Sequence, residues 1–357
     1  GSPMIDHVNT TTDELRADLV LEGGGVKGLG LVGAVSGLYE HGYRFGGPAR
    51  VAGTSAGAMV AALIAAGMPV PRMVEVMRGL ELPRFQDGGN RLRQGLALLT
   101  GLGLHPGDYL RNWIAKELEE LGVRTFGDLR IDDPASDLPA ERAYRLVVVV
   151  SDITSGHMVR LPWDYGRYGL DPDKQLVADA VRASASIPFF YRPVQLRLPG
   201  DGEVAVHVDG GMLSNFPINL FDRTDGQRPR WPTFGVKLSG RPAPGPWRAS
   251  WAPVRNLAGL SKALITTMAN AHDRVYLDDP AVCARTVFVE TFGVKATDFD
   301  LSPDQQRDLY EGGRVGAAGF LTGWDFAAYL ARYRPIEEPA AGEPPAVVAA
   351  GIPAPRS

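Results

Sequence analysis

Ser55 stands two residues after Gly53 and two residues before Gly57, which gives the spacing G-x-S-x-G. An apolar segment precedes this motif, and a run of small residues follows it. That context is typical of a sharp turn between a strand and a helix, which presents a serine hydroxyl for nucleophilic attack. The same spacing also arises by chance in glycine-rich chains, so the flanking segments are what make it informative.

A second glycine-rich segment, bounded by Gly23 and Gly28, reads G-G-G-V-K-G. It also follows an apolar segment and opens a helical pattern. Backbone N–H groups gathered at the start of a helix are suited to hold a developing negative charge. The segment therefore predicts the group of N–H donors that would stabilise the negative charge formed when a hydroxyl attacks a carbonyl.

Other interpretations of the glycine-rich segment are weaker. The spacing G-x-G-x-x-G fits a dinucleotide site, but that site needs an acidic residue at the end of the next strand. That strand ends instead near Ser55, and Glu40 falls at the end of the intervening helix. A phosphate-binding loop would need Ser or Thr directly after Lys27, where Gly28 stands. A tight turn without chemistry is the remaining alternative.

Asp209, followed by Gly210 and Gly211, ends a further apolar segment. Taken alone, this is an ordinary Asp-Gly turn. Taken with the other two motifs, it supplies a carboxylate that can act as a base. A serine, a group of N–H donors and a carboxylate form a minimum set for acyl transfer.

A triad with histidine must be weighed against this set. Ser55, Asp209 and His272 stand in the order serine, acid, histidine that a known class of hydrolases uses. However, His272 falls in a segment with helical periodicity, whereas triad histidines usually lie on loops. His207 alternates with valines on its strand, which favours a packed histidine. None of the six histidines is paired at metal-ligand spacing.

The segments around these motifs predict the elements that position them. Apolar runs of strand length are followed by longer segments with helical periodicity. We expect strands at residues 18–22, 50–53, 146–150, 204–208, 233–238 and 286–290. We expect helices at residues 26–41, 56–66, 108–121, 174–186 and about 303–321, with an N-cap and capping box at Ser302. Residues 73–107 are less regular. This alternation predicts an α/β fold with a mainly parallel sheet covered by helices on both faces.

Composition limits the classes of function. The chain has 357 residues, a net charge of −4 and 45% hydrophobic residues, enough for one large domain. The weakly acidic charge gives no support for nucleic-acid binding. Cys283 is the single cysteine, so an intramolecular disulfide is excluded. No apolar run has the length of a membrane span, and we expect a cytoplasmic protein, compatible with peripheral membrane contact.

The two ends of the sequence differ from its centre. Gly1, Ser2 and Pro3 before Met4 resemble the remnant of a cleaved tag, and no signal-peptide pattern follows. We expect residues 1–17 to be an extension, residues 18–335 the catalytic domain, and residues 336–357 a disordered tail rich in Pro and Ala.

At this point the chain resembles the patatin-like phospholipases over residues 19–220. Members carry a glycine-rich motif, a G-x-S-x-G turn and a later D-G-G or D-G-A in this order, as here. Residues 182–188 (R-A-S-A-S-I-P) also look like the family's segment that leads from a helix to a proline. Lys27 stands where the family has Lys or Arg. The resemblance implies the patatin-like fold, a three-layer sandwich around the central sheet.

The resemblance also implies a mechanism. Family members use a Ser–Asp dyad without histidine, so Ser55 would attack an ester carbonyl and Asp209 would take its proton. The N–H groups of Gly24, Gly25 and Val26 would hold the oxyanion. Lys27 would either balance the charge of a lipid phosphate or form a structural ion pair. The implied substrate is a lipid acyl ester, in particular a phospholipid, and no cofactor or metal is implied.

Two further functions stay open at the level of sequence. One is an acyltransferase, in which an alcohol replaces water, and the other is a lipid-binding module without turnover. A lipid substrate needs an apolar approach, for which residues 96–104 are candidates. Aromatic residues could anchor at a membrane interface or pack in the core: Trp113, Trp163, Tyr165, Tyr168, Trp247 and Trp251. Head-group preference and oligomeric state are left open.

Overall fold

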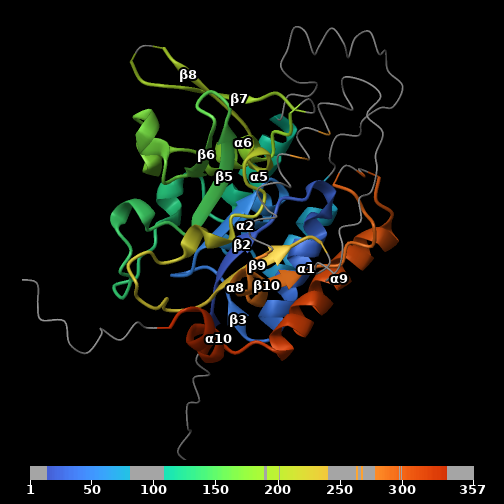
Figure 1. Ribbon diagram of the computed structural model, residues 1–357. Helices are drawn as coiled ribbons and strands as arrows, with labels where there is room; N and C mark the ends of the chain where they lie inside the picture. Colours follow the sequence, from blue (N-terminus) through green and yellow to red (C-terminus); the bar gives the residue numbers. More distant parts are fainter. Residues whose placement is uncertain are drawn as a thin grey trace, which may run out of the picture.

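The fold is taken from a computed structural model, which describes residues 14–80, 108–188, 191–200, 202–239, 263, 267, 278–296, 298 and 300–335. Its centre is an eight-stranded sheet with the order β10-β9-β2-β4-β5-β8-β7, and β6 pairs with β5 (Figure 1). The strands are β2 (Asp18–Leu21), β4 (Val51–Thr54), β5 (Leu146–Asp152), β6 (His157–Leu161), β7 (Val194–Arg197), β8 (Val204–Asp209), β9 (Thr233–Lys237) and β10 (Thr286–Phe288). Two further short strands, β1 (Leu15–Arg16) and β3 (Tyr43–Arg44), pair with each other.

Parallel pairing unites β10, β9, β2, β4 and β5, whereas β8 runs antiparallel to β5 and β7 runs antiparallel to β8. All seven residues of β5 are buried, as a strand covered on both faces requires. The six strands that the sequence predicts are all present, and the prediction of a mainly parallel sheet is confirmed. The pairs formed by β6, β7, β1 and β3 were not expected from periodicity.

Helices cover the sheet on both faces (Figure 1). Described helices of at least five residues are α1 (Gly28–Glu40), α2 (Ala56–Ala65), α3 (Val70–Arg78), α5 (Asp108–Glu120), α6 (Val177–Ser184), α8 (Pro280–Ala284), α9 (Pro303–Thr322) and α10 (Phe326–Tyr333). On one face, residues of α1, α2, α5, α6 and α9 form a large apolar core with alternate strand residues. On the other face, Val20, Ala52 and Val147 pack with the 3₁₀ helix η7 (Ile218–Phe221) and α8. This is the three-layer arrangement predicted above.

One helix begins at a local signal that the sequence predicts. Ser302 caps α9, and its side chain accepts a hydrogen bond from the Gln305 N–H, which completes the capping box. Helix α3 was not predicted, because it buries only Met73, Val76 and Met77. The remainder of the irregular stretch, residues 81–107, lies outside the described residues, as does the predicted tail at 336–357.

Candidate active site

Ser55 occupies the turn between β4 and α2, where the sequence motif places it. Its backbone has φ 54° and ψ −120°, a region that residues other than glycine rarely adopt. Such strain persists only where the surroundings enforce it, and it is concentrated at functional sites. The turn aims the serine away from the strand at the carboxyl end of the parallel sheet. The residue is nearly buried, with 6% of its surface exposed.

The two glycines of the motif are explained by close backbone contact. A Cβ on Gly53 would lie 2.2 Å from the carbonyl carbon of Gly57. A Cβ on Gly57 would lie 2.4 Å from the carbonyl oxygen of Leu21 on the neighbouring strand. The start of α2 therefore presses directly on β4 and β2, and this packing holds Ser55 in its strained conformation.

Asp209 reaches the serine through the pairing of three strands. Thr54 at the end of β4 lies opposite Val149 of β5, and the next residue of β5, Val150, lies opposite Asp209 at the end of β8. This register brings the carboxylate beside the turn that follows Thr54. The Ser55 side chain lies close enough to this carboxylate to lower its pKa as a hydrogen-bonding neighbour. The structure thus joins two residues that are far apart in the sequence.

The glycines after Asp209 fit the same crowded region. A Cβ on Gly210 would lie 2.3 Å from the carbonyl oxygen of Val149, and a Cβ on Gly211 would lie 3.0 Å from Oδ1 of Asp209. The N–H of Gly211 donates a 2.7 Å hydrogen bond to that oxygen. The turn therefore orients the carboxylate, in addition to ending the strand.

Burial dominates the electrostatics of Asp209. Removal from water raises the pKa of this carboxyl group to about 6, although hydrogen bonds from the Gly211 N–H and the Ser55 side chain oppose the shift. A carboxylate with such a pKa is ionised at neutral pH and is a better proton acceptor than an exposed aspartate. This is the tuning that general bases show.

Two serines, Ser184 at the end of α6 and Ser186 two residues later, form hydrogen bonds with the backbone N–H groups of Ser55 and Asp209. The Ser184 hydroxyl accepts a 2.9 Å hydrogen bond from the Ser55 N–H and donates a 2.6 Å bond to the Val149 carbonyl. The Ser186 carbonyl accepts a 2.9 Å bond from the Asp209 N–H. Both serines belong to the segment 182–188, which the sequence singled out without a role for them.

The glycine-rich segment forms the turn between β2 and α1, next to the serine. A Cβ on Gly23 would lie 3.3 Å from Cβ of Ser55. The 3₁₀ helix η1 (Gly25–Lys27) follows, and Gly25 has φ 55°, so a side chain there would be strained. At Gly28, where α1 begins, a Cβ would lie 2.8 Å from Met77 Cε, the flexible end of a side chain.

The three N–H groups proposed for the oxyanion are not equivalent. Val26 donates its N–H to the Ala296 carbonyl at 3.1 Å. Among the described residues, the N–H groups of Gly24 and Gly25 have no hydrogen-bond acceptor. A Cβ on Gly25 would lie only 2.1 Å from the same Ala296 oxygen. In this conformation the donors available to a ligand at the turn are therefore those of Gly24 and Gly25.

Asn215, which sequence reasoning missed, connects the two glycine turns. Its Nδ2 donates to the Gly23 carbonyl at 3.0 Å and to Oε1 of Glu22 at 3.3 Å, and its backbone carbonyl accepts from the Gly23 N–H at 3.2 Å. Its Oδ1 would lie 2.9 Å from a Cβ on Gly211. No sequence signal beyond its position after the D-G-G motif marked this residue.

Lys27 lies beside a buried ion pair rather than in open solvent. Its Nζ donates to the Leu238 carbonyl at 3.3 Å. Burial lowers its pKa, Glu22 opposes that shift, and Lys237 adds to it. Glu22 and Lys237 form a buried ion pair with each other. This placement favours the structural interpretation of Lys27 over a contact with a lipid phosphate.

The other candidate residues pack away from this site or lie outside the described residues. His207 is buried and its Nε2 lies 3.2 Å from the Tyr168 hydroxyl, and burial lowers its pKa although Asp152 opposes the shift. Tyr165 is buried in the core, against which Trp113, Trp163 and Tyr168 also pack. Outside the description lie His272, Trp247, Trp251 and residues 96–104.

The described residues contain neither a cluster of metal-ligating side chains nor a helix that could span a membrane. No three side chains of His, Cys, Asp or Glu are grouped as ligands for a metal ion would be. Within the same residues, every helix is too short or too polar to cross a membrane.

Comparison with known proteins supplies a family. Residues 19–222 match the profile of the Patatin-like phospholipase family. The uncharacterized protein YqhO of Bacillus subtilis (strain 168) is 39% identical over 314 residues, which are 87% of this chain and 99% of YqhO. The uncharacterized protein R571 of Acanthamoeba polyphaga mimivirus is 22% identical over 205 residues, 57% of this chain and 61% of R571.

Solved structures are more distant. VipD of Legionella pneumophila has a TM-score of 0.45 and 19% identity, and the match covers 86% of this chain and 66% of VipD. The type III effector ExoU of Pseudomonas aeruginosa has a TM-score of 0.42 and 19% identity, covering 86% of this chain and 53% of ExoU. The profile match, which spans more than half of the chain, carries the assignment: the chain belongs to the patatin-like phospholipase family, a family of lipid acyl hydrolases.

Proposed function

We propose that this protein is a serine-dependent lipid acyl hydrolase of phospholipase A type, in which Ser55 is the nucleophile and Asp209 the base. The observation that carries the proposal is the strand register that brings the Asp209 carboxylate beside Ser55 at a strained turn, next to the unused N–H groups of Gly24 and Gly25. The proposed catalytic unit is residues 18–335, and the substrate is an acyl ester of a lipid, in particular a phospholipid.

The first half-reaction follows from these positions. Oγ of Ser55 forms a bond to the ester carbonyl carbon while its proton passes to Asp209. The carbonyl oxygen becomes an oxyanion that accepts hydrogen bonds from Gly24 and Gly25, and each such donor typically contributes about 10²–10³ in rate. The bond to the leaving alcohol then breaks, and that alcohol takes the proton from Asp209. The products are an acyl-serine and a lysolipid or other alcohol.

The second half-reaction restores the enzyme by the same groups. Asp209 takes a proton from water, whose oxygen attacks the acyl carbonyl carbon. The Ser55 oxygen leaves and recovers the proton from Asp209, and the fatty acid is released. A pKa of about 6 suits this double role, because the carboxyl group must both accept and return a proton near neutral pH.

The test uses a fluorophosphonate probe and a panel of mixed lipids. We expect the probe to label the wild-type chain at Ser55, and mass spectrometry to show fatty acid and lysolipid released from the panel. Ser55→Ala should abolish both signals. Ser155→Ala, which removes an exposed hydroxyl on the turn between β5 and β6, is the matched control and should retain both.

Three outcomes would contradict parts of the proposal. Labelling that persists in Ser55→Ala would move the nucleophile elsewhere. An unlabelled but folded wild-type protein would favour a lipid-binding module. Acyl esters of an added alcohol, in place of free fatty acid, would indicate an acyltransferase with the same acyl-serine.

A further inference from the structure

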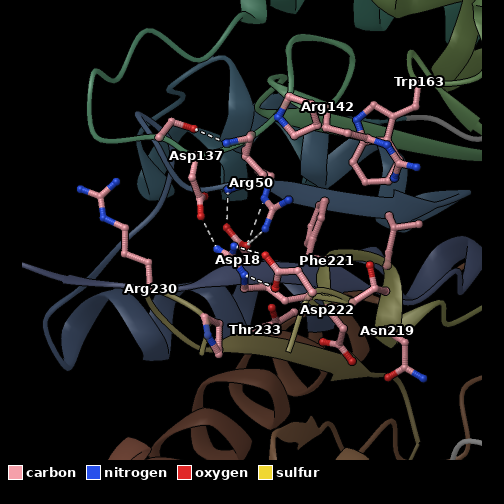
Figure 2. Close-up of a pocket in the computed structure, with 18 of the residues that line it drawn as sticks. Asp18, Arg50, Asp137, Arg142, Trp163, Asn219, Phe221, Asp222, Arg230 and Thr233 are labelled. Carbon is pink, nitrogen blue, oxygen red and sulfur yellow. Dashed lines mark hydrogen bonds and ion pairs between the residues drawn. The ribbon is translucent and has the colours of Figure 1, made fainter. Parts of the chain in front are cut away.

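A cavity of about 660 Å³ lies at the amino ends of the parallel strands (Figure 2). Asp18 and Thr233, the first residues of β2 and β9, line it, as does Arg50 just before β4. Ser55 lies at the opposite end of β4, so the length of this four-residue strand separates the two sites by roughly 13 Å. The volume is within the range of small-molecule sites, and the proposed function leaves this cavity unused.

One wall combines cations with aromatic rings. The guanidinium of Arg142 lies 4.3 Å from the ring centre of Trp163, and that of Arg50 lies 4.4 Å from the ring centre of Phe221. The two rings meet edge to face at 6.0 Å. Figure 2 shows Arg142 beside Trp163 among the residues that line the cavity. Stacking fixes the orientation of a guanidinium while leaving its N–H groups available.

Most arginines around the cavity already have a carboxylate partner. Nitrogen–oxygen distances in these pairs are 2.8 Å for Arg50–Asp18, 2.9 Å for Arg160–Asp164, 2.6 Å for Arg230–Asp133 and 2.5 Å for Arg223–Asp137. Arg142 differs, because within the described part of the chain its guanidinium has neither an ion pair nor a hydrogen-bond acceptor. Its guanidinium lies over the Trp163 ring instead.

The surroundings of Arg142 disfavour its charge. Burial lowers its pKa first, Arg160 and Arg50 lower it further, and Asp164 and Glu141 only partly oppose the shift. Arg142 is therefore a half-buried cation, next to two other cations whose own carboxylates are engaged. A bound anion would remove this imbalance, since a planar guanidinium can donate two parallel hydrogen bonds to an oxoacid group.

We propose that this cavity binds a small organic anion whose phosphate or carboxylate group pairs with Arg142. Its apolar portion would lie along the apolar wall, which includes Leu138, Phe221 and Leu220. The carboxylates that also line the cavity, among them Asp133, Asp137 and Asp222, favour a ligand with one oxoacid group over a polyanion. The site is separate from Ser55, so it is suited to an effector or a second ligand and does not depend on the proposed hydrolysis.

Isothermal titration calorimetry on the full chain tests this site with sodium phosphate, glycerol 3-phosphate and octanoate as probes. We expect saturable binding of at least one organic probe, with unchanged affinity in Ser55→Ala. Arg142→Gln should weaken binding at least tenfold, and Arg142→Lys, which keeps the charge but loses the fork, should weaken it less. Arg197→Gln is the matched control, because Arg197 is an exposed arginine on β7.

The arms of the experiment separate the sources of the anion. Binding of glycerol 3-phosphate without octanoate assigns a phosphate group, and the reverse assigns a carboxylate. Circular dichroism checks that each variant is folded. The proposal is overturned if none of the probes binds saturably, or if folded Arg142→Gln and Arg142→Lys both bind as the wild type does.

Discussion

Replacing Asp209 by asparagine should make the protein inactive and, at neutral pH, more stable. The side chain keeps its shape and its acceptor oxygen for the Gly211 N–H, but it can no longer take the Ser55 proton. Loss of a general base typically costs about 10²–10⁴ in rate. At about 1.36 kcal/mol for each factor of ten, this is roughly 3–5 kcal/mol of transition-state stabilisation.

The gain in stability follows from the raised pKa of Asp209. Its shift from 3.8 to about 6 means that the folded protein holds the ionised carboxylate at a cost of about 3 kcal/mol. Because the folded-state pKa is the higher one, this cost is absent below about pH 4, grows as the pH rises towards 6, and is complete above 6. Asparagine resembles the neutral acid, so Asp209→Asn should gain up to about 3 kcal/mol at pH 7.5 and almost nothing at pH 4.

Two measurements check this pair of effects. Hydrolysis of a p-nitrophenyl ester gives kcat/KM, and urea unfolding at pH 4.5, 6 and 7.5 gives the free energy of unfolding. Asp152→Asn is the matched control, because Asp152 is another buried carboxylate on the same sheet. Burial raises its pKa, but hydrogen bonds from Tyr168, Ser155 and Thr154 outweigh that effect and lower it. This control should lose stability at neutral pH while its folded fraction stays active.

The reasoning would be refuted by either of two results. If Asp209→Asn keeps kcat/KM within a factor of three of the wild type, Asp209 is not the base. If the variant is less stable than the wild type by the same amount at pH 4.5 and 7.5, the carboxylate is not held at an electrostatic cost. A loss of activity with no gain in stability would support Asp209 as the base but contradict the electrostatic cost of its carboxylate.

Further predictions concern Ser55, Asp209 and the groups around them. The kcat/KM of the wild type should rise about tenfold per pH unit up to about pH 6 and then level off, as expected when Asp209 must be ionised; a flat profile between pH 4.5 and 7 would contradict this. Gly25→Ala should lower kcat by about 10²–10³ and also lower the melting temperature, whereas Gly67→Ala, at a positive φ in open space, should lower the melting temperature alone. Asn215→Ala should lower kcat with little change in KM, because it loosens the glycine turn at Gly23 without removing a proposed oxyanion donor; a change confined to KM would oppose this role. His272→Ala should keep activity within about tenfold of the wild type, because we expect no catalytic histidine, and loss of a triad histidine would cost several orders of magnitude. A loss of that size in a folded variant would support a triad that includes His272.

Local sequence was sufficient for much of the site. The turn at Ser55 could be predicted because its strand, its two glycines and its helix are contiguous, and close backbone contact requires glycine at Gly53 and Gly57. The six main strands could be predicted because buried strands are continuous apolar runs. The capping box at Ser302 is likewise a signal contained within a few residues.

The order of the strands in the sheet could not be predicted from the sequence and is known only from the tertiary structure. Periodicity shows that a segment is a strand, but it does not show which strand lies beside it. The antiparallel pairing of β8 with β5 brings Asp209 to Ser55 and raises its pKa through burial. Without that pairing, the aspartate would be an ordinary turn residue.

The same limit applies to contacts between distant segments. Three hydrogen bonds join residues that no spacing rule connects: Asn215 to the Gly23 carbonyl, the Ser55 N–H to Ser184, and the Val26 N–H to the Ala296 carbonyl. Arg142 became distinctive only when the fold set it against Trp163 and left it without a carboxylate among the described residues. A sequence specifies which groups can donate, accept or ionise. Their partners, and the burial that sets their pKa values, depend on packing between segments far apart in the chain.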